Sequence, residues 1–522
     1  MVSQLCWGCL STTGLRQTSR ALLHPAPAAP QHYRQLTART TTSLFHTSAT
    51  RYANPLQKKS KSMEGAPKFR ESKSARMRKP KKATVDRGRP PAIGERKALR
   101  KRIVLSNTNA LEVPGMQEFS EETMVDTRIR GSVLGLPVPM IDQLRALQAF
   151  KPSQGWSLFR RPGVVLRRET LEMGRIFEGI STEGPDQGKV VKKVLTGKRA
   201  CGKSVHLLQA MAMGLLKKWV VISIPDPQEL VIAQTTYAPL PDTNPVQYVQ
   251  EKATSELLQR TVLANEEVLS KLHVSMEHPE LKSLVKPKTT LAELARLGVQ
   301  DVTIAWPVWQ AFWAEINATA PKTAQKADDK AQSTFQNRPP LLVTVDGLGH
   351  WMQESKYRNA DFKPIHAHDL ALVQHFVSLL TPQSSNKPTM PNGGVVLFAT
   401  SGSNSPAVPT LDIALAQLKA RQQGVAESSA EFPQPDPYAE TDNRVLDLFK
   451  QAASKSSSSP LELQTLGGLS REEARGYMEY FARSGILQEK ITEEWVSEKW
   501  SIAGGGIIGE MEKLGKRLRT VL

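Results

Sequence analysis

The sequence predicts an α/β fold with a parallel sheet, followed by a small, mainly helical C-terminal domain and preceded by a basic arm. Two observations predict the sheet: a glycine-rich loop between an apolar strand and a helix, and later apolar runs of strand length at residues 220–224, 341–346 and 394–401. The third observation is the charge distribution. Residues 1–102 hold 23 lysines and arginines against 4 acids and so carry the whole net charge of +19.

The glycine-rich loop has the sequence Gly-x-x-x-x-Gly-Lys-Ser at residues 197–204. Val194 and Leu195 before it are apolar, and residues 205–219 after it have the apolar spacing of a helix. Strand, glycine loop and helix in this order are the context of a phosphate-binding P-loop. The alternative is a chance match within a basic loop, and the flanking strand and helix argue against it.

Each residue type in this loop has a chemical reason. Gly197 and Gly202 allow tight turns, so that successive backbone N–H groups point at phosphate oxygens. The start of the next helix adds a partial positive charge. In such loops the lysine, here Lys203, reaches the terminal phosphates, and the hydroxyl of Ser204 binds a magnesium ion. The predicted nucleotide-binding segment consists of Gly197, Lys198, Arg199, Ala200, Cys201, Gly202, Lys203, Ser204 and Val205.

A second metal residue is predicted at the end of the apolar run 341–346, which closes with Asp346. This is the pattern of a Walker B strand, whose carboxylate orients magnesium through its water shell. An apolar strand ending in an acid is common by chance, so the prediction of Ser204 and Asp346 as a metal pair depends on the glycine loop. Thr400 or Ser401, after the run 394–401, would contact a γ-phosphate or simply end a strand.

The rest of the central region has mainly helical patterns. The loop, its helix and the run 220–224 form one β-loop-α-β unit, which implies parallel strands. Helices are expected at about 247–272, 290–315 and 411–422, and a polar surface loop at 317–338. The second of these helices carries three tryptophans on one face, which we expect in the core: Trp306, Trp309 and Trp313.

The C-terminal part has the pattern of a compact helical module. Ser470 and Glu473 form a capping box that opens a helix ending at Gly485. Residues 486–500 have mixed strand and helical character, so the predicted domain is winged-helix-like or lid-like. The predicted division of the chain is a transit peptide at 1–51, a basic disordered arm at 52–105, a P-loop domain at 106–440 and the C-terminal domain at 441–522.

The N-terminal composition predicts import into mitochondria. Residues 1–51 contain five arginines, 14 serines and threonines, and no acid. Residues 43–48 are similar to processing regions of fungal mitochondrial precursors. The following arm, rich in lysine and arginine, is expected to bind RNA phosphates; a merely solvated tail is the alternative. The chain has no run of 18 apolar residues, so we expect no membrane insertion.

Two features argue against rapid hydrolysis and leave the base undetermined. Active ATPases of the AAA type usually place a glutamate after the Walker B aspartate to polarise water, and here that residue is Gly347. His350 is a substitute candidate, although a histidine at a helix start near a strand end is more often structural. The guanine-reading string Asn-Lys-x-Asp is absent from the sequence, and the nearest match, at residues 386–389, lacks the acid. We therefore predict no catalytic residue and slow hydrolysis at most.

With these segments together, the chain resembles the death-associated protein three family of mitochondrial small-subunit ribosomal proteins, over about residues 135–515. Four segments carry the resemblance, and the last three are the more specific: residues 195–204, 244–248, 264–272 and 343–347. The resemblance implies a AAA-like P-loop domain in the head of the mitochondrial small ribosomal subunit. It also implies bound GTP or GDP with Mg²⁺, with ATP left open.

The partners that the resemblance implies are small-subunit ribosomal RNA and neighbouring ribosomal proteins, in the mitochondrial matrix. Our leading prediction is therefore a structural ribosomal component that holds a nucleotide. Two alternatives stay open from the residues alone. One is a working AAA-type ATPase or ribosome-assembly factor, and the other is a P-loop kinase for a small molecule.

Overall fold

The computed structural model describes residues 103–181, 184–286, 288–319, 335–382, 390–403, 406–454 and 459–516. The predicted transit peptide and nearly all of the predicted basic arm lie outside these residues, as do most of the predicted polar loop and the string at 386–389. The predicted domain boundaries remain predictions.

The centre of the described chain is a five-stranded sheet in which every neighbouring pair is parallel, in the order β11-β3-β10-β7-β4. Its strands are β3 (Val190–Thr196), β4 (Val220–Ile224), β7 (Leu341–Asp346), β10 (Gly394–Ala399) and β11 (Leu461–Thr465). The predicted α/β class and parallel sheet are confirmed. The edge strand β11 was not predicted, and it lies within the segment that we assigned to the C-terminal domain.

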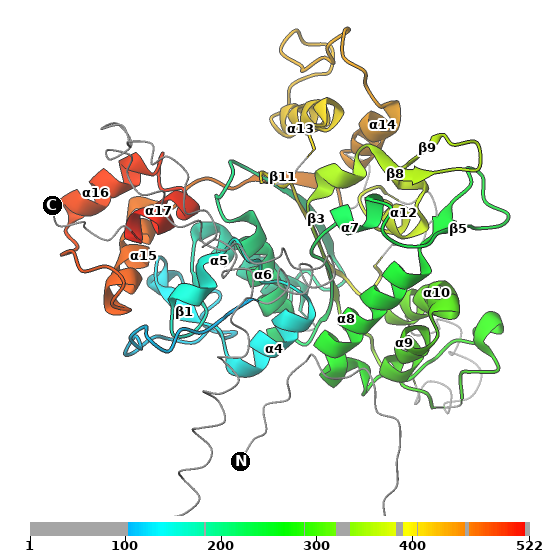
Figure 1. The fold of residues 1–522 in the computed structure, drawn as a ribbon, viewed down its shortest axis with the longest axis horizontal. Helices are drawn as coiled ribbons and strands as arrows, with labels where there is room; N and C mark the ends of the chain where they lie inside the picture. The colour runs from blue at the N-terminus through cyan, green and yellow to red at the C-terminus, as the bar shows by residue number, and fades with distance from the viewer. Residues whose placement is uncertain are drawn as a thin grey trace, which may run out of the picture. The chain divides into compact units, whose positions relative to one another are not determined.

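Both faces of the sheet are covered, which explains why its strands are almost continuously apolar. Alternate residues of β7 belong to different cores, because successive side chains of a strand point to opposite faces. Leu342 packs with α5 and α6, while Val343 packs with α8, α9 and α10. Figure 1 shows these two groups of helices on opposite sides of the sheet.

The helices on the first side are α4 (Val138–Ala146), α5 (Arg168–Ile180) and α6 (Lys203–Leu216). Those associated with the second core are α7 (Gln228–Val231), α8 (Glu251–Leu269), α9 (Leu291–Gln300), α10 (Ala305–Ile316), α12 (Ala371–Val377), α13 (Pro409–Gln422) and α14 (Asn443–Ala452). Helix α10 carries Trp306 and Trp309 into the core as predicted. Helix α6 ends before the predicted residue 219, since Lys218 has a positive φ that turns Trp219 onto Phe177.

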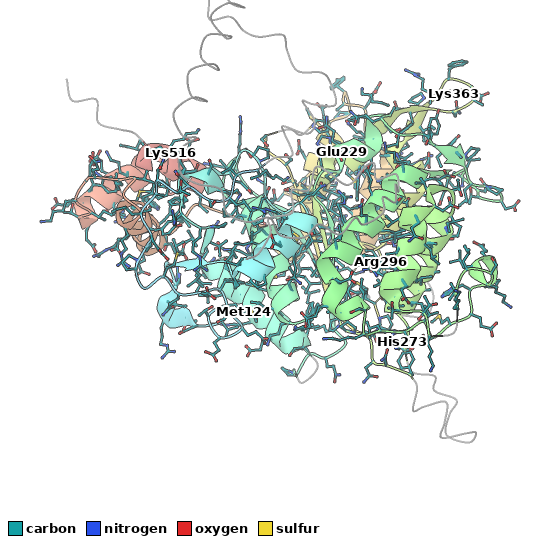
Figure 2. The ribbon with its side chains drawn as sticks, turned by 60° about the horizontal axis from the view of Figure 1, so that its bottom comes forward. Met124, Glu229, His273, Arg296, Lys363 and Lys516 are labelled. Atoms are coloured by element: carbon teal, nitrogen blue, oxygen red, sulfur yellow. The ribbon has the colours of Figure 1, made fainter. Side chains whose placement is uncertain are left out.

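Three short antiparallel ribbons lie outside the sheet. They pair β1 (Val133–Gly135) with β2 (Gly163–Val165), β5 (Ala238–Pro239) with β6 (Tyr248–Val249), and β8 (Glu354–Arg358) with β9 (Pro364–His366). Figure 2 shows two labelled lysines on opposite sides of the described part of the molecule: Lys363, just before β9, and Lys516, at the C-terminal end of α17. No helix among the described residues is long and apolar enough to span a bilayer.

The C-terminal module consists of α15 (Arg471–Arg483), α16 (Glu493–Ile502) and α17 (Ile508–Gly515), and its small core also includes Phe159 and Val165. The capping box of Ser470 and Glu473 is confirmed. The strand character expected within 486–500 is not found: in residues 466–516 the structure has helices and turns, and α16 begins at Glu493. A glycine turn at 504–506, with positive φ at each residue, then folds α17 back onto α15.

Candidate nucleotide-binding site

The glycine loop joins β3 to α6, as the motif predicts, and its backbone turns through conformations that favour glycine. Gly197 has a φ of +145° and Gly202 a φ of +96°, while Ala200 between them has a φ of +63°. A Cβ atom on Gly197 would lie 2.3 Å from the carbonyl oxygen of Leu466. The first glycine is therefore required both by its own conformation and by the close approach of the segment after β11.

Lys203 and Ser204 are the first two residues of α6. The Lys203 ammonium donates to the carbonyl oxygens of Gly197, at 2.8 Å, and Lys198, at 3.0 Å, and the residue is 7 % exposed. These bonds hold the charge above the loop at the positive end of the helix. The arrangement is one in which a phosphate oxygen can replace a carbonyl as the partner of the ammonium.

A cleft of about 560 Å³ opens beside the loop. Its lining comes from the loop and α6, from the segment between α4 and β2, from the residues after β10, and from α15 and α17. Of the predicted segment, the cleft is lined by Arg199, Ala200, Gly202, Lys203, Ser204 and Val205, and after β10 by Thr400 and Ser401. A cavity of this size holds a nucleotide.

The other predicted loop residues, Gly197, Lys198 and Cys201, do not line the cleft. Gly197 and Lys198 offer their carbonyl oxygens to Lys203. Cys201 is 1 % exposed, and its carbonyl oxygen accepts a bond of 2.9 Å from Arg167. These residues accept hydrogen bonds that fix the loop. Only part of the predicted segment therefore lines the cleft, where it could contact a ligand.

Asp346 ends β7, whose register places it opposite Ala399, the residue before Thr400. Its side chain is 9 % exposed and forms an ion pair with the ammonium of Lys151. Lys151 lines the cleft together with Lys203 and Ser204. The sequence did not predict Lys151, because a lysine after an amphipathic helix has no local signal that pairs it with a distant strand end.

Two further contacts that the sequence did not predict tie the loop to the C-terminal part of the chain. Arg167, 3 % exposed, donates to the carbonyl oxygens of Cys201 and Gly467, at 2.9 and 3.0 Å. The Gly509 N–H, in the first turn of α17, donates to the carbonyl oxygen of Ala200 at 3.0 Å. The helical module therefore contacts the loop and lines one side of the cleft. A glycine in the first turn of a helix and an arginine before a helix are too common to indicate this from sequence.

Two titratable groups around the site have shifted pKa values. Burial, aided by Arg167, lowers the pKa of His206 to about 4, so this imidazole is neutral at physiological pH. Burial raises the pKa of Asp226, which follows β4, as does the charge of Glu229; Lys151 and His350 act in the opposite direction. His350 itself is buried in the turn after β7 and does not line the cleft.

The residues present fit a magnesium ion only in part. A hydroxyl and a carboxylate are the oxygen ligands that magnesium prefers, and the ion usually completes its shell with water and phosphate oxygens. Within the described residues there is no cluster of three or more His, Cys, Asp or Glu side chains that could hold a metal alone. Ser204 and Asp346 would therefore hold the ion, and Asp346 already has Lys151 as a partner.

The fold and site define an α/β protein with a glycine loop at the carboxyl end of a parallel strand. Residues 164–514 match the family model described as mitochondrial ribosomal death-associated protein 3, which is more than half of the chain. The chain belongs to this family, as the sequence predicted, and the predicted location in the mitochondrial ribosome is thereby confirmed.

Two relatives agree with this assignment. The chain is 40% identical over 434 residues to the small ribosomal subunit protein mS29 of Neurospora crassa, covering 83% of this chain and 84% of that protein. It is 22% identical over 391 residues to the protein of the same name from Schizosaccharomyces pombe, covering 73% and 71%.

Proposed function

We propose that this protein is a structural component of the mitochondrial small ribosomal subunit that holds a purine nucleotide, GTP or GDP before ATP, and so supports mitochondrial translation. The ribosomal part of the proposal follows from the family and from the two relatives named as small-subunit proteins. Its partners are then small-subunit ribosomal RNA and the neighbouring ribosomal proteins.

One observation carries the nucleotide part of the proposal. The Lys203 ammonium and the Ser204 hydroxyl lie at the start of α6, at the edge of a cleft of about 560 Å³, next to a loop that turns at Gly197 and Gly202. Phosphates would lie over the loop, with backbone N–H groups and Lys203 as donors. A AAA-like P-loop domain is also supported by the parallel sheet, in which the loop follows β3 and Asp346 is the last residue of β7.

The nucleotide is proposed to act as a structural ligand that turns over slowly at most. Gly347 stands where an ATPase would place its glutamate, and its N–H donates to the Ala399 carbonyl oxygen at 2.9 Å, which fixes the strand end. Arg167 bridges the loop to Gly467, and Gly509 donates to Ala200 of the loop. These contacts suggest what a bound nucleotide would stabilise, namely the packing of the C-terminal module against the sheet.

The experiment that tests this proposal begins with mitochondrial small subunits. The protein is extracted from subunits washed in high salt, and its bound nucleotide is identified by mass. A stoichiometric guanine nucleotide supports the proposal, and an adenine nucleotide corrects the base. An empty site, or a protein that is absent from the washed subunits, favours the alternative of a soluble ATPase or assembly factor.

A point variant tests the site itself. Lys203→Ala removes the ammonium, and we expect GDP binding by the purified chain to weaken by at least a hundredfold, since a charge-assisted bond to phosphate in a partly buried site is lost, at roughly 3 kcal/mol. Lys189→Ala is the control, because it removes a lysine paired with Asp186 at the surface, at 3.5 Å. Unchanged affinity of Lys203→Ala, measured by calorimetric titration, contradicts the assignment of the loop.

A further inference from the structure

We propose that Lys151 is a tethered cation of the nucleotide site, which neutralises Asp346 and allows the site to hold a nucleoside diphosphate with little dependence on magnesium. This inference rests on the proposed nucleotide function and deepens it. It assigns a role to a residue that belongs to neither of the expected motifs.

The ion pair of Lys151 with Asp346 lies at the carboxyl edge of the sheet. The Asp346 side chain is 9 % exposed and the Lys151 side chain 30 %. The lysine reaches the acid from the side of the cleft, since it lines the cleft with Lys203, Ser204 and Thr400. Its ammonium is therefore placed between the carboxylate and the space that phosphates would occupy.

The position of Lys151 is fixed by its own turn. Its backbone N–H donates to the side-chain oxygen of Gln154 at 2.8 Å, and the Gln154 N–H donates back to the Lys151 carbonyl oxygen at 3.1 Å. The indole N–H of Trp156 donates to the same Gln154 oxygen at 2.6 Å. Trp156 is buried and packs edge-on against Phe150, with ring centroids 5.2 Å apart.

This anchoring separates Lys151 from an ordinary surface lysine. A free lysine loses side-chain entropy when it pairs, and exposed pairs contribute little. Here the backbone is held by a turn flanked by the buried Phe150 and Trp156, and the partner carboxylate is nearly buried. Lys151 also lies within electrostatic reach of Asp226, at the end of the neighbouring strand β4. Two acids at this edge thus face one ammonium.

The consequence concerns charge at the phosphate site. A bare Asp346 carboxylate would repel a diphosphate, and in a site that depends on Mg²⁺ the metal removes that repulsion. With Lys151 in place the carboxylate is compensated by the chain itself. A metal ion that binds at Asp346 must compete with the ammonium, so the metal should add little to nucleotide affinity.

The test measures the affinity of the full-length chain for GDP, and for ADP in parallel, in excess Mg²⁺ and in EDTA. For each nucleotide, the ratio compared is the dissociation constant in EDTA divided by the dissociation constant in excess Mg²⁺. We expect a ratio below about three for the wild-type chain and of roughly ten or more for Lys151→Met, because the carboxylate charge is then uncompensated in EDTA. Lys189→Met, which removes a surface lysine paired with Asp186, should keep the wild-type ratio.

Two further variants make the outcome independent of the folding of one protein. Asp346→Asn keeps the ammonium without its carboxylate, and it should bind GDP in EDTA at least as tightly as the wild-type chain. The double variant Lys151→Met/Asp346→Asn should return the ratio to below about three, because the carboxylate that Lys151 compensates is also absent.

The outcomes separate the two proposals. Equal ratios for Lys151→Met and the wild-type chain, or a wild-type ratio of roughly ten or more, overturn the role of Lys151 while leaving nucleotide binding intact. Failure of the wild-type chain to bind either nucleotide in either buffer overturns the proposed function, and the present inference with it. A ratio that rises only in Lys151→Met supports both.

Discussion

At Gly197, a φ of +145° and the nearness of the Leu466 carbonyl oxygen act together. Gly197→Ala would place a methyl group 2.3 Å from that oxygen. We expect the free energy of unfolding to fall by about 3 kcal/mol, as backbone strain and a clash with main-chain atoms add. Chemical denaturation of the purified chain measures this loss.

The matched control is Gly424→Ala. Gly424 also has a positive φ, of +81°, but open space surrounds the position of its Cβ. This variant should cost only the strain of the left-handed conformation, about 1 kcal/mol. Equal losses for the two variants would show that the approach of the segment after β11 adds nothing to the requirement for glycine.

The same scale shows why the site was only partly predictable. The motif residues lie within eight consecutive positions, 197–204. The motif therefore predicted that they surround one loop, and the structure shows that loop between β3 and α6. Lys151 meets Asp346 only because α4 and β7 fold toward one sheet edge. Such a pairing of side chains from distant segments leaves no periodicity or spacing in the sequence.

Helix α15 illustrates what local pattern determines at the scale of elements. Its capping box was predicted, and Glu473 has further partners: it accepts from the Ser470 N–H at 2.8 Å, the Arg130 side chain at 2.9 Å and the Arg168 N–H at 2.9 Å. Burial raises the pKa of Glu473, but these bonds outweigh it and hold the pKa below its usual 4.5. Glu473 thus also joins α15 to the segment before β1 and to the first residue of α5.

Glu473→Gln should therefore destabilise the chain by about 2 kcal/mol at pH 7, because a charged acceptor of several N–H groups is lost. Glu472→Gln, at the exposed neighbouring position, should cost less than about 0.5 kcal/mol. The folded-state pKa of Glu473 is depressed, so its contribution is present above about pH 4.5 and is lost as the pH falls through the folded value. Unfolding of both variants at pH 7 and pH 4 measures the difference, and a loss that does not shrink at low pH would contradict the role of the carboxylate.

Strands could be predicted where burial on both faces requires a continuous apolar run. The strands β4, β7 and β10 are buried on both faces and have continuous apolar runs. Strand β11 lies at the edge and is only partly buried; Leu461 is buried while Glu462 is exposed. A short strand with three polar residues has the same pattern as a loop, so only its pairing with β3 defines it.

At the scale of the whole molecule, the folded part and the source of charge are separate. The family match at 164–514 spans all five strands of the sheet and nearly all of the helical module. Residues 1–102 carry the whole net charge of +19, and the remaining chain has equal numbers of acidic and basic residues. A neutral body gains little affinity for RNA from long-range attraction, so the basic segment should supply it.

Deletion of residues 52–102, which stops before the buried Leu105, should therefore leave the unfolding temperature and GDP affinity unchanged and weaken binding to small-subunit RNA. Each phosphate contact that is lost reduces the slope of log affinity against log salt by about 0.7 to 0.9, since fewer counterions are released. The measurement is binding of the purified chain to the RNA across a salt series. A control with the same residues in shuffled order should bind like the wild-type chain, because counterion release depends on charge and not on order. Equal slopes for the deletion and the wild-type chain would place the RNA contacts on the folded part instead.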